Sequence, residues 1–190
     1  MRYQYHKKQQ SKPRRGFTLV ETLVAITILL VAIVGPMTIA ARGLQTAFYA
    51  REQIIAFSLA QEGVELIRKI RDENALNPVV TDWLANIPAA CRAGGGCGLD
   101  ARGTASANCS TSSNCQLKYD SGSLSNNRGF YTYAPGTLTP FTRKIWLLDE
   151  PTGPGREIRV IVEVSWQSGL FAGPKKVTVL TRLFNQYNNI

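Results

Sequence analysis

Histidine is nearly absent from this chain of 190 residues, in which His6 is the only one. Ser-His-Asp and Cys-His catalytic arrangements need a histidine as the base, and histidine-ligated metal sites need it as a ligand. The glycine run 94–96 lacks the Lys-Ser/Thr that would follow in a phosphate-binding loop. The sequence therefore predicts a protein that is not an enzyme, with no catalytic residue, no cofactor and no metal-binding site.

Acidic residues are missing from the first 16 positions, which carry six bases: Arg2, Lys7, Lys8, Lys12, Arg14 and Arg15. The other residues carry 16 bases against 13 acids, so most of the formal charge of +9 belongs to this short segment. A basic segment before an apolar run usually stays in the cytoplasm and sets membrane topology. Nucleic acid is therefore an unlikely partner on charge grounds.

Charge is also scarce in the next segment, because Glu21 is the only ionisable side chain in residues 17–34. As a helix these residues would span about 27 Å, enough to cross most of a bilayer core. A cleaved secretory signal has a shorter apolar core and a small-residue cleavage site, which the region 38–41 fits poorly. We expect a membrane-spanning segment with the residues after about 42 outside the cytoplasm.

The border between the basic and apolar segments reads Gly16-Phe17-Thr18-Leu19-Val20-Glu21. A glycine leaves the backbone accessible and able to extend, as a protease requires at its scissile bond. A carboxylate in an apolar segment costs about 2.5–3.5 kcal/mol at mid-bilayer and less near the interface, so Glu21 should have a partner. Cleavage after Gly16 would create one, the α-amine of Phe17 in the same or a neighbouring chain.

This border resembles the processing motif of type IV prepilins and type II secretion pseudopilins. The resemblance implies that a prepilin peptidase cleaves between Gly16 and Phe17 and that the amine of Phe17 is methylated. It also implies that Glu21 pairs with the Phe17 amine of an adjacent subunit during assembly. The alternative is a plain signal anchor in which Glu21 is accidental.

Helical periodicity continues after the apolar run. Gly35-Pro36 predicts a kink or a looser turn, because proline lacks the amide donor and clashes with the preceding turn. Apolar residues then recur every three or four positions, which predicts an amphipathic helix that ends near Glu73-Asn74. We assign residues 1–16 to a removed leader, 17–41 to a transmembrane and assembly helix, and 42–74 to a helix of the head. Residues 59–72 are similar to this helix in minor pilins.

All four cysteines lie in residues 75–128, which we expect to be an irregular, variable region. Outside the cytoplasm an even number of cysteines predicts disulfides. The equal C-x5-C intervals favour Cys91–Cys97 and Cys109–Cys115, although four cysteines allow three connectivities. Each small loop would contribute about 2–3 kcal/mol on the loop-entropy model. A zinc site made of the four thiolates is the alternative, but its usual spacings are shorter.

Alternation with period two begins at Gly129 and predicts strands at 130–133, 141–148, 158–166 and 176–184. Pro140 and the stretches 151–155 and 169–174 predict the turns. Short connections imply an antiparallel meander over 129–190 with one face on the helix, hence an α+β fold. Residues 142–185 resemble the C-terminal sheet of minor pilins. Asp149-Glu150 is expected to be a solvated hairpin end, with a calcium loop as the less favoured alternative.

The favoured function is a structural subunit, more in keeping with a minor than an abundant one, of a type IV pilus or a pseudopilus. Its partners would be a prepilin peptidase, the inner membrane before assembly, and other pilin or pseudopilin subunits through the N-terminal helices. Its location would be the cytoplasmic membrane, with the leader inside and the head outside, and then a periplasmic or cell-surface filament.

Three alternatives stay open on the sequence: a type II secretion pseudopilin, a tip minor pilin, and a signal-anchored enzyme. The tip pilin would use residues 75–128 as an adhesin or, in a competence pilus, to bind nucleic acid. The enzyme would keep residues 1–16 and would not associate with filaments. Which secretion, pilus or competence machine the chain serves does not follow from its residues.

We expect Gly16→Leu to block removal of the leader, because a bulky side chain would occupy the position where the peptidase needs bare backbone. Intact mass after co-production with a prepilin peptidase measures this directly. Efficient cleavage of the Gly16→Leu chain would contradict assignment of the cleavage site to Gly16-Phe17.

Overall fold

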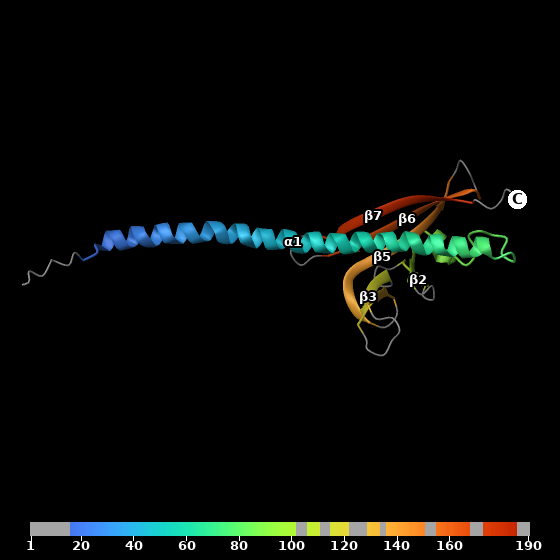
Figure 1. The fold of residues 1–190 in the computed structure, drawn as a ribbon, viewed down its shortest axis with the longest axis horizontal. Helices are drawn as coiled ribbons and strands as arrows, with labels where there is room; N and C mark the ends of the chain where they lie inside the picture. The colour runs from blue at the N-terminus through green and yellow to red at the C-terminus, as the bar shows by residue number, and fades with distance from the viewer. Residues whose placement is uncertain are drawn as a thin grey trace, which may run out of the picture. The chain divides into compact units, whose positions relative to one another are not determined.

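The computed structural model describes seven stretches of the chain: residues 16–101, 106–110, 115–121, 129–133, 136–150, 155–167 and 173–185. Two compact units divide between Thr46 and Ala47, and each is considered separately below. Figure 1 shows one long helix and a sheet whose strands come from the C-terminal half of the chain. The fold is α+β, as the sequence predicts.

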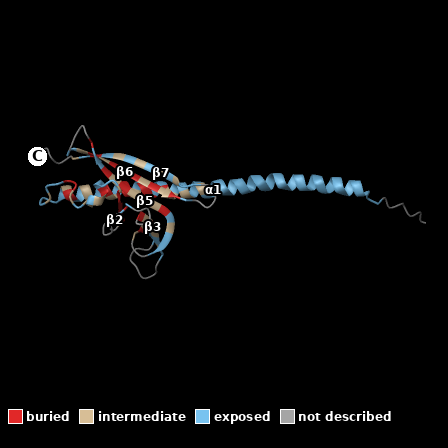
Figure 2. Ribbon diagram, turned by 180° about the vertical axis from the view of Figure 1, so that it is seen from behind, coloured by how far each residue is buried: buried red, intermediate tan, exposed pale blue. Residues whose placement is uncertain are grey.

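The helix α1 runs from Leu19 to Leu76. It begins and ends two residues later than expected, and it continues through Pro36 without interruption, so the predicted loosening there does not break it. In the first unit every described residue is exposed, as the uniform pale blue of this segment shows (Figure 2). Among the described residues, α1 is the one helix that is long and apolar enough to cross a membrane.

The second unit contains the core. Its part of α1 buries one stripe, which consists of Ala56, Leu59, Ala60, Gly63, Val64, Ile67 and Asn74. Two long strands lie against this stripe, β5 (Thr137–Asp149) and β6 (Glu157–Trp166), and a third, β7 (Lys175–Phe184), pairs with β6. They form an antiparallel meander in chain order, and β6 alternates strictly between buried and half-buried residues. The strands predicted for the C-terminal part are thus confirmed, with bounds shifted by a few residues.

Residues 75–128 are not irregular throughout, which corrects the expectation for this region. They contain a 3-10 helix η1 (Ala89–Arg92) and the strands β1 (Cys97–Leu99), β2 (Ser106–Asn108) and β3 (Gln116–Asp120). With β4 (Phe130–Thr132), these strands join the same sheet in the order β2-β1-β5-β3-β4. Runs of three to five residues are too short to display a convincing alternation, so pairing with β5 decides their conformation.

Pro140 lies inside β5 and does not form the expected turn. The pairing of β5 with β3 changes register between Gln116 and Lys118, next to this proline. Side chains bridge the irregularity: the Gln116 amide donates to the Thr139 carbonyl at 2.8 Å, and the Thr139 hydroxyl donates to the Leu117 carbonyl at 2.7 Å. A proline without an amide donor is tolerated in a strand at such a bulge.

Gly63 sets the distance between α1 and the sheet. A Cβ at this position would lie 2.8 Å from Cγ1 of Val162 on β6 and 3.5 Å from Cδ of Arg143 on β5. Val162 is fully buried and β-branched, so it cannot move aside easily. Side chains on a helix tilt towards its N-terminus, and the missing side chain therefore also leaves the carbonyl of Leu59, one turn earlier, open to β5.

Arg143 uses that opening. Its guanidinium is fully buried and donates from Nη1 to the Leu59 carbonyl at 3.1 Å and from Nη2 to the Leu99 carbonyl of β1. Nη1 also lies 3.4 Å from Oε2 of Glu62. One cation thereby connects α1, β1 and β5. Such a pair is weak evidence for net stability, but removal of one partner leaves a buried charge uncompensated.

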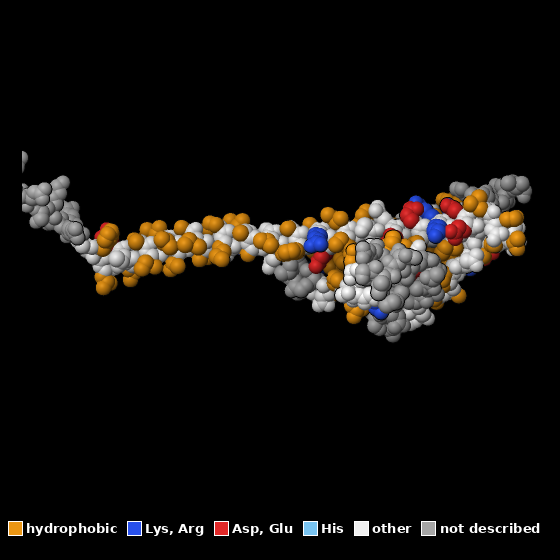
Figure 3. Space-filling model, turned by 60° about the horizontal axis from the view of Figure 1, so that its bottom comes forward, with side chains coloured by type: hydrophobic (Ala, Val, Ile, Leu, Met, Phe, Trp, Pro, Cys, Tyr) orange, Lys and Arg blue, Asp and Glu red, His pale blue; other side chains and the backbone are white. Residues whose placement is uncertain are grey.

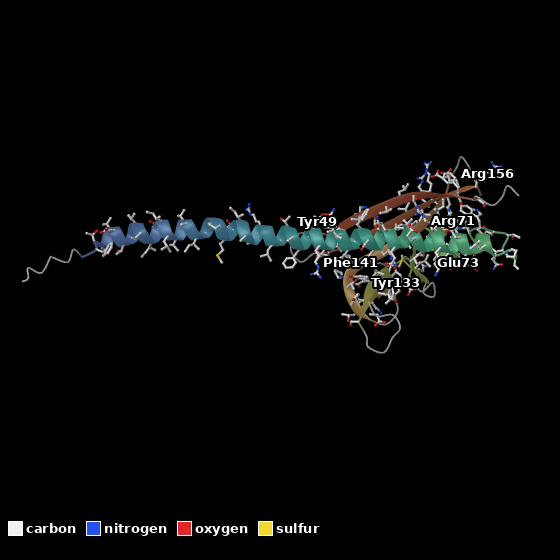
Figure 4. All side chains as sticks on the ribbon, viewed as in Figure 1. Tyr49, Arg71, Glu73, Tyr133, Phe141 and Arg156 are labelled. Carbon is white, nitrogen blue, oxygen red and sulfur yellow. A yellow bond between two sulfur atoms is a disulfide. The ribbon has the colours of Figure 1, made fainter. Side chains whose placement is uncertain are left out.

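Tyr133 lies beside Arg143 on the sheet side of α1 (Figure 4). Its hydroxyl donates to the Arg143 carbonyl at 3.1 Å. The Cζ atom of the Arg143 guanidinium lies 5.9 Å from the centroid of the Tyr133 ring. Burial raises the pKa of Tyr133, while Arg143 acts in the opposite direction. The phenol therefore stays neutral and serves as a hydrogen-bond donor.

Glu150 corrects a second expectation, because it is buried and is therefore not a solvated hairpin end. Its side chain is buried and forms an ion pair with Arg159 on β6. The Nε atom of Arg182 on β7 lies 3.8 Å from the same carboxylate oxygen, Oε1. The hydrogen bond from Arg159 and the charges of both arginines hold the pKa of Glu150 below its ordinary value. This acid, which directly follows β5, therefore connects the ends of β5, β6 and β7 through its two arginine partners.

We expect Gly63→Ala to lower the stability of the head. Alanine would gain about 1 kcal/mol in helix propensity, but forcing a methyl against Val162 costs roughly 1–3 kcal/mol, and Gly63→Leu should cost more. Near-UV circular dichroism reports on the head selectively, because Trp83, Trp146 and Trp166 all lie in it.

Gly43→Ala is the matched control, since a Cβ there meets no atom within 4 Å. Its head Tm should equal that of the wild type in the same detergent. A Gly63→Ala chain with an unchanged or higher Tm would show that the helix and sheet are not in the close contact described.

We expect Glu150→Gln to lower the Tm of the head at pH 7 and to have a smaller effect as the pH falls. A lowered carboxylate pKa contributes stability above its unfolded-state value, and this contribution is lost as pH falls through the folded-state value. Melting curves of both chains from pH 7 to about pH 3 should therefore converge at the acid end. A difference in Tm that is constant with pH would mean that the charge of Glu150 is not what matters.

Candidate functional site

The predicted cleavage site lies in non-helical backbone just before α1. Gly16 and Phe17 are both exposed, Phe17 to 79 %, and a Cβ on Gly16 would meet no atom within 4 Å. Gly16 does not have a positive φ, so the backbone conformation at this position does not require glycine. The leader residues 1–15, His6 included, lie outside the described part of the chain. The predicted scissile bond is thus accessible without unwinding the helix.

Thr18 caps the start of α1. Its hydroxyl oxygen accepts a hydrogen bond from the Glu21 amide at 3.3 Å, and its carbonyl accepts from the Thr22 amide at 3.2 Å. The spacing Thr18-x-x-Glu21 is that of a capping box. This capping signal is visible in the sequence itself. The Thr18 cap uses only the backbone amide of Glu21, so the carboxylate of Glu21 is left for other partners.

The helix start also explains why a new amine at Phe17 would seek a carboxylate. The N-terminus of a helix carries a partial positive charge, which favours an acid in the first turn by about 0.3–1 kcal/mol and disfavours a cation. Glu21 is the acid in the first turn of α1. Cleavage would place an ammonium group next to this dipole, and Glu21 is the nearest group in the sequence able to neutralise it.

The surface of α1 beyond this site is more apolar than its composition shows, because most of its threonine hydroxyls are hydrogen-bonded within the helix. Between Phe17 and Phe48 the large apolar side chains are all exposed, and Figure 3 shows hydrophobic side chains along the whole visible face of this segment. Four of the five threonine hydroxyls in this segment donate to carbonyls of their own helix at 2.7–2.9 Å, three or four residues earlier; these are Thr22, Thr27, Thr38 and Thr46. These hydroxyls therefore do not need water as a hydrogen-bond acceptor.

Such a surface suits lipid or other helices. Within the described residues, nothing of the same chain covers it. The one acid of this surface is Glu21 and the one base is Arg42. The arrangement can hold the chain in a membrane and can present a helix for packing. Because each of its two charged groups needs a partner of opposite charge, these groups can fix the register of that packing.

The four cysteines form the disulfides Cys91–Cys97 and Cys109–Cys115, the pairing that the sequence favours. All four are fully buried. Cys97 opposes Asn108 in the β1–β2 pair and Cys109 directly follows β2, so the two bridges are close to each other. Among the described residues no group of histidine, cysteine, aspartate or glutamate is arranged to hold a metal ion.

Residues 11–35 match the family model of the prokaryotic N-terminal methylation motif, which is the signature of type IV pilins and pseudopilins. The match contains the end of the predicted leader, the predicted scissile bond, Phe17, Glu21 and the apolar run as far as Gly35. It does not extend to the head. Neither the comparison with curated proteins nor that with solved structures finds a match for the chain.

Proposed function

We propose that this chain is a structural subunit of a type IV pilus or a related pseudopilus, and a minor one. The methylation motif supports a pilin-like or pseudopilin precursor. The observation that carries the proposal is the position of this motif. Its scissile bond is exposed immediately before a helix whose apolar surface has no cover within the described part of the chain.

The proposed mechanism is physical rather than catalytic. The apolar segment holds the precursor in the inner membrane, with the basic leader in the cytoplasm and the head outside. A prepilin peptidase cleaves between Gly16 and Phe17, and the Phe17 amine is methylated. The helices then leave lipid and pack against those of other pilin or pseudopilin subunits, which cover the same apolar surface in a periplasmic or cell-surface filament.

Glu21 provides the specificity of this step. In lipid-like surroundings a carboxylate and an ammonium group stabilise each other, whereas either one alone is costly. Pairing of Glu21 with the Phe17 amine of an adjacent subunit would therefore reward one axial position of the helices over others. In the uncut chain the capping contact with Thr18 keeps Glu21 at the helix start, where the new amine would arrive.

The head belongs to this proposal as the part that faces outward. Its two disulfides are suited to an oxidising compartment. We assign it no ligand, because the described surface favours neither an adhesin nor a nucleic-acid site over a purely structural head.

We expect Glu21→Gln to be processed normally but to enter filaments at least about tenfold less than the wild type, a change that corresponds to ~1.4 kcal/mol. Glutamine fits the capping-box position, so the variant removes the charge while the helix start is kept. The measurements are intact mass for processing and the amount of the chain in filaments sheared from the cells.

Thr18→Ala is the control, because it weakens the helix cap by about 0.5–2 kcal/mol and leaves the charge of Glu21 in place. This chain should still be incorporated. Normal incorporation of a processed Glu21→Gln chain would refute the role of Glu21 in assembly.

A further inference from the structure

Charged side chains are few on α1 before Glu62. Residues 17–61 contain the acids Glu21 and Glu52 and the bases Arg42 and Arg51. Glu62, the next acid, already pairs with Arg143 of its own chain. If Glu21 is taken by an adjacent Phe17 amine, Glu52 is the one acid of this stretch that remains available to a base.

Arg42 is a base in need of such an acid. It is exposed on the apolar surface of α1, and its side chain makes no hydrogen bond or ion pair with any residue that the structure describes. Arg42 follows Phe17 by 25 positions, about 38 Å of helix, which exceeds the ~30 Å of a bilayer core. Headgroups and water therefore solvate it before assembly. Once neighbouring helices cover this surface, a lone guanidinium would be costly.

Glu52 is an acid in need of a base. It is half-buried where α1 joins the head, and its Oε2 atom is buried with no hydrogen-bond partner among the described residues. The adjacent Arg51 projects about 100° away around the helix and forms no ion pair with it in the described part of the chain. Burial and the neighbouring Tyr119 raise the pKa of Tyr131 on β4, and the charge of Arg51 opposes that rise.

We propose that Arg42 of one copy forms an ion pair with Glu52 of an adjacent copy in the filament. The inference rests on the proposed function and names a second contact between subunits. Charge complementarity identifies the occupant: a base in an apolar surface and an unsatisfied acid at its end occur in the same sequence, and packed copies of the chain present both.

The direction of the offset between copies supports the pairing. When Glu21 of one copy meets the Phe17 amine of its neighbour, the neighbour is shifted along the helix axis. Phe17 of the neighbour is then level with Glu21 of the first copy. Arg42 and Glu52 require a displacement in the same direction. The offset is four residues for Glu21 with Phe17 and ten residues for Glu52 with Arg42. The difference of six residues corresponds to about 9 Å of helix, which the long side chains of Arg42 and Glu52 can span together. One displacement can therefore satisfy both pairs.

Charge reversal in the full chain tests this pairing. The variants are produced in cells that lack the native copy but keep the peptidase and assembly apparatus. Arg42→Glu and Glu52→Arg should each reduce incorporation into sheared filaments at least about tenfold, while Arg42→Glu/Glu52→Arg should recover to within about threefold of wild type. Arg51→Glu/Glu52→Arg is the matched control and should stay as low as Glu52→Arg alone.

A second pair of variants guards against a misfolded head. Glu52→Gln keeps the shape of the side chain and should lower incorporation, and Arg42→Gln/Glu52→Gln should recover it because no charge is left without a partner. Intact mass and the head Tm are measured for every chain.

The outcomes separate the two claims. Recovery by both double variants supports the pair. A wild type that enters filaments, with properly cleaved and folded double variants that do not recover, overturns the pair and leaves the proposed function standing. A wild type that never enters filaments overturns the proposed function and the pair with it.

Discussion

The apolar surface of α1 between Phe17 and Phe48 is the constraint on which the rest of the molecule depends. It is exposed on all sides, and most of its threonine hydroxyls are satisfied within the helix, so water is a poor environment for it. Lipid and neighbouring helices are the two surroundings that suit it. Under the proposed function, this surface accounts for a basic leader that orients the chain, a border that is cleaved before assembly, and few charges, each of which has to find a partner.

The head solves a different problem on the same helix. From Tyr49 onwards α1 changes from a uniformly apolar rod to a one-sided helix, and its buried stripe is held against β5 and β6 by a glycine and an arginine. Gly63 allows the close approach, and the carbonyl that it uncovers accepts from Arg143. Tyr49, Trp166 and Phe141 complete this contact near the start of the head, with ring centroids 6.3 Å apart in each successive pair (Figure 4).

Much of this could be predicted because the signals are local. The membrane segment, the motif at Gly16–Glu21, the three long strands and the spacing of the cysteines are all visible as short patterns. The strands β1 to β3 were missed, since each is too short to show a period and forms only by pairing with β5. Pro140 was misread as a turn because the bulge that tolerates it depends on β3. The inward position of Arg143 and the burial of Glu150 were also invisible, because their partners lie far away in the sequence.

The mature N-terminus tests the central claim most directly. Intact mass and N-terminal sequencing after co-production with a prepilin peptidase should show a chain that begins at Phe17 and is heavier by one methyl group. That result would place the chain on the pilin pathway and leave only the identity of its filament to be found. A chain that begins at Met1, or near residue 41 after conventional signal cleavage, would contradict the account, because Glu21 would then have no amine to pair with.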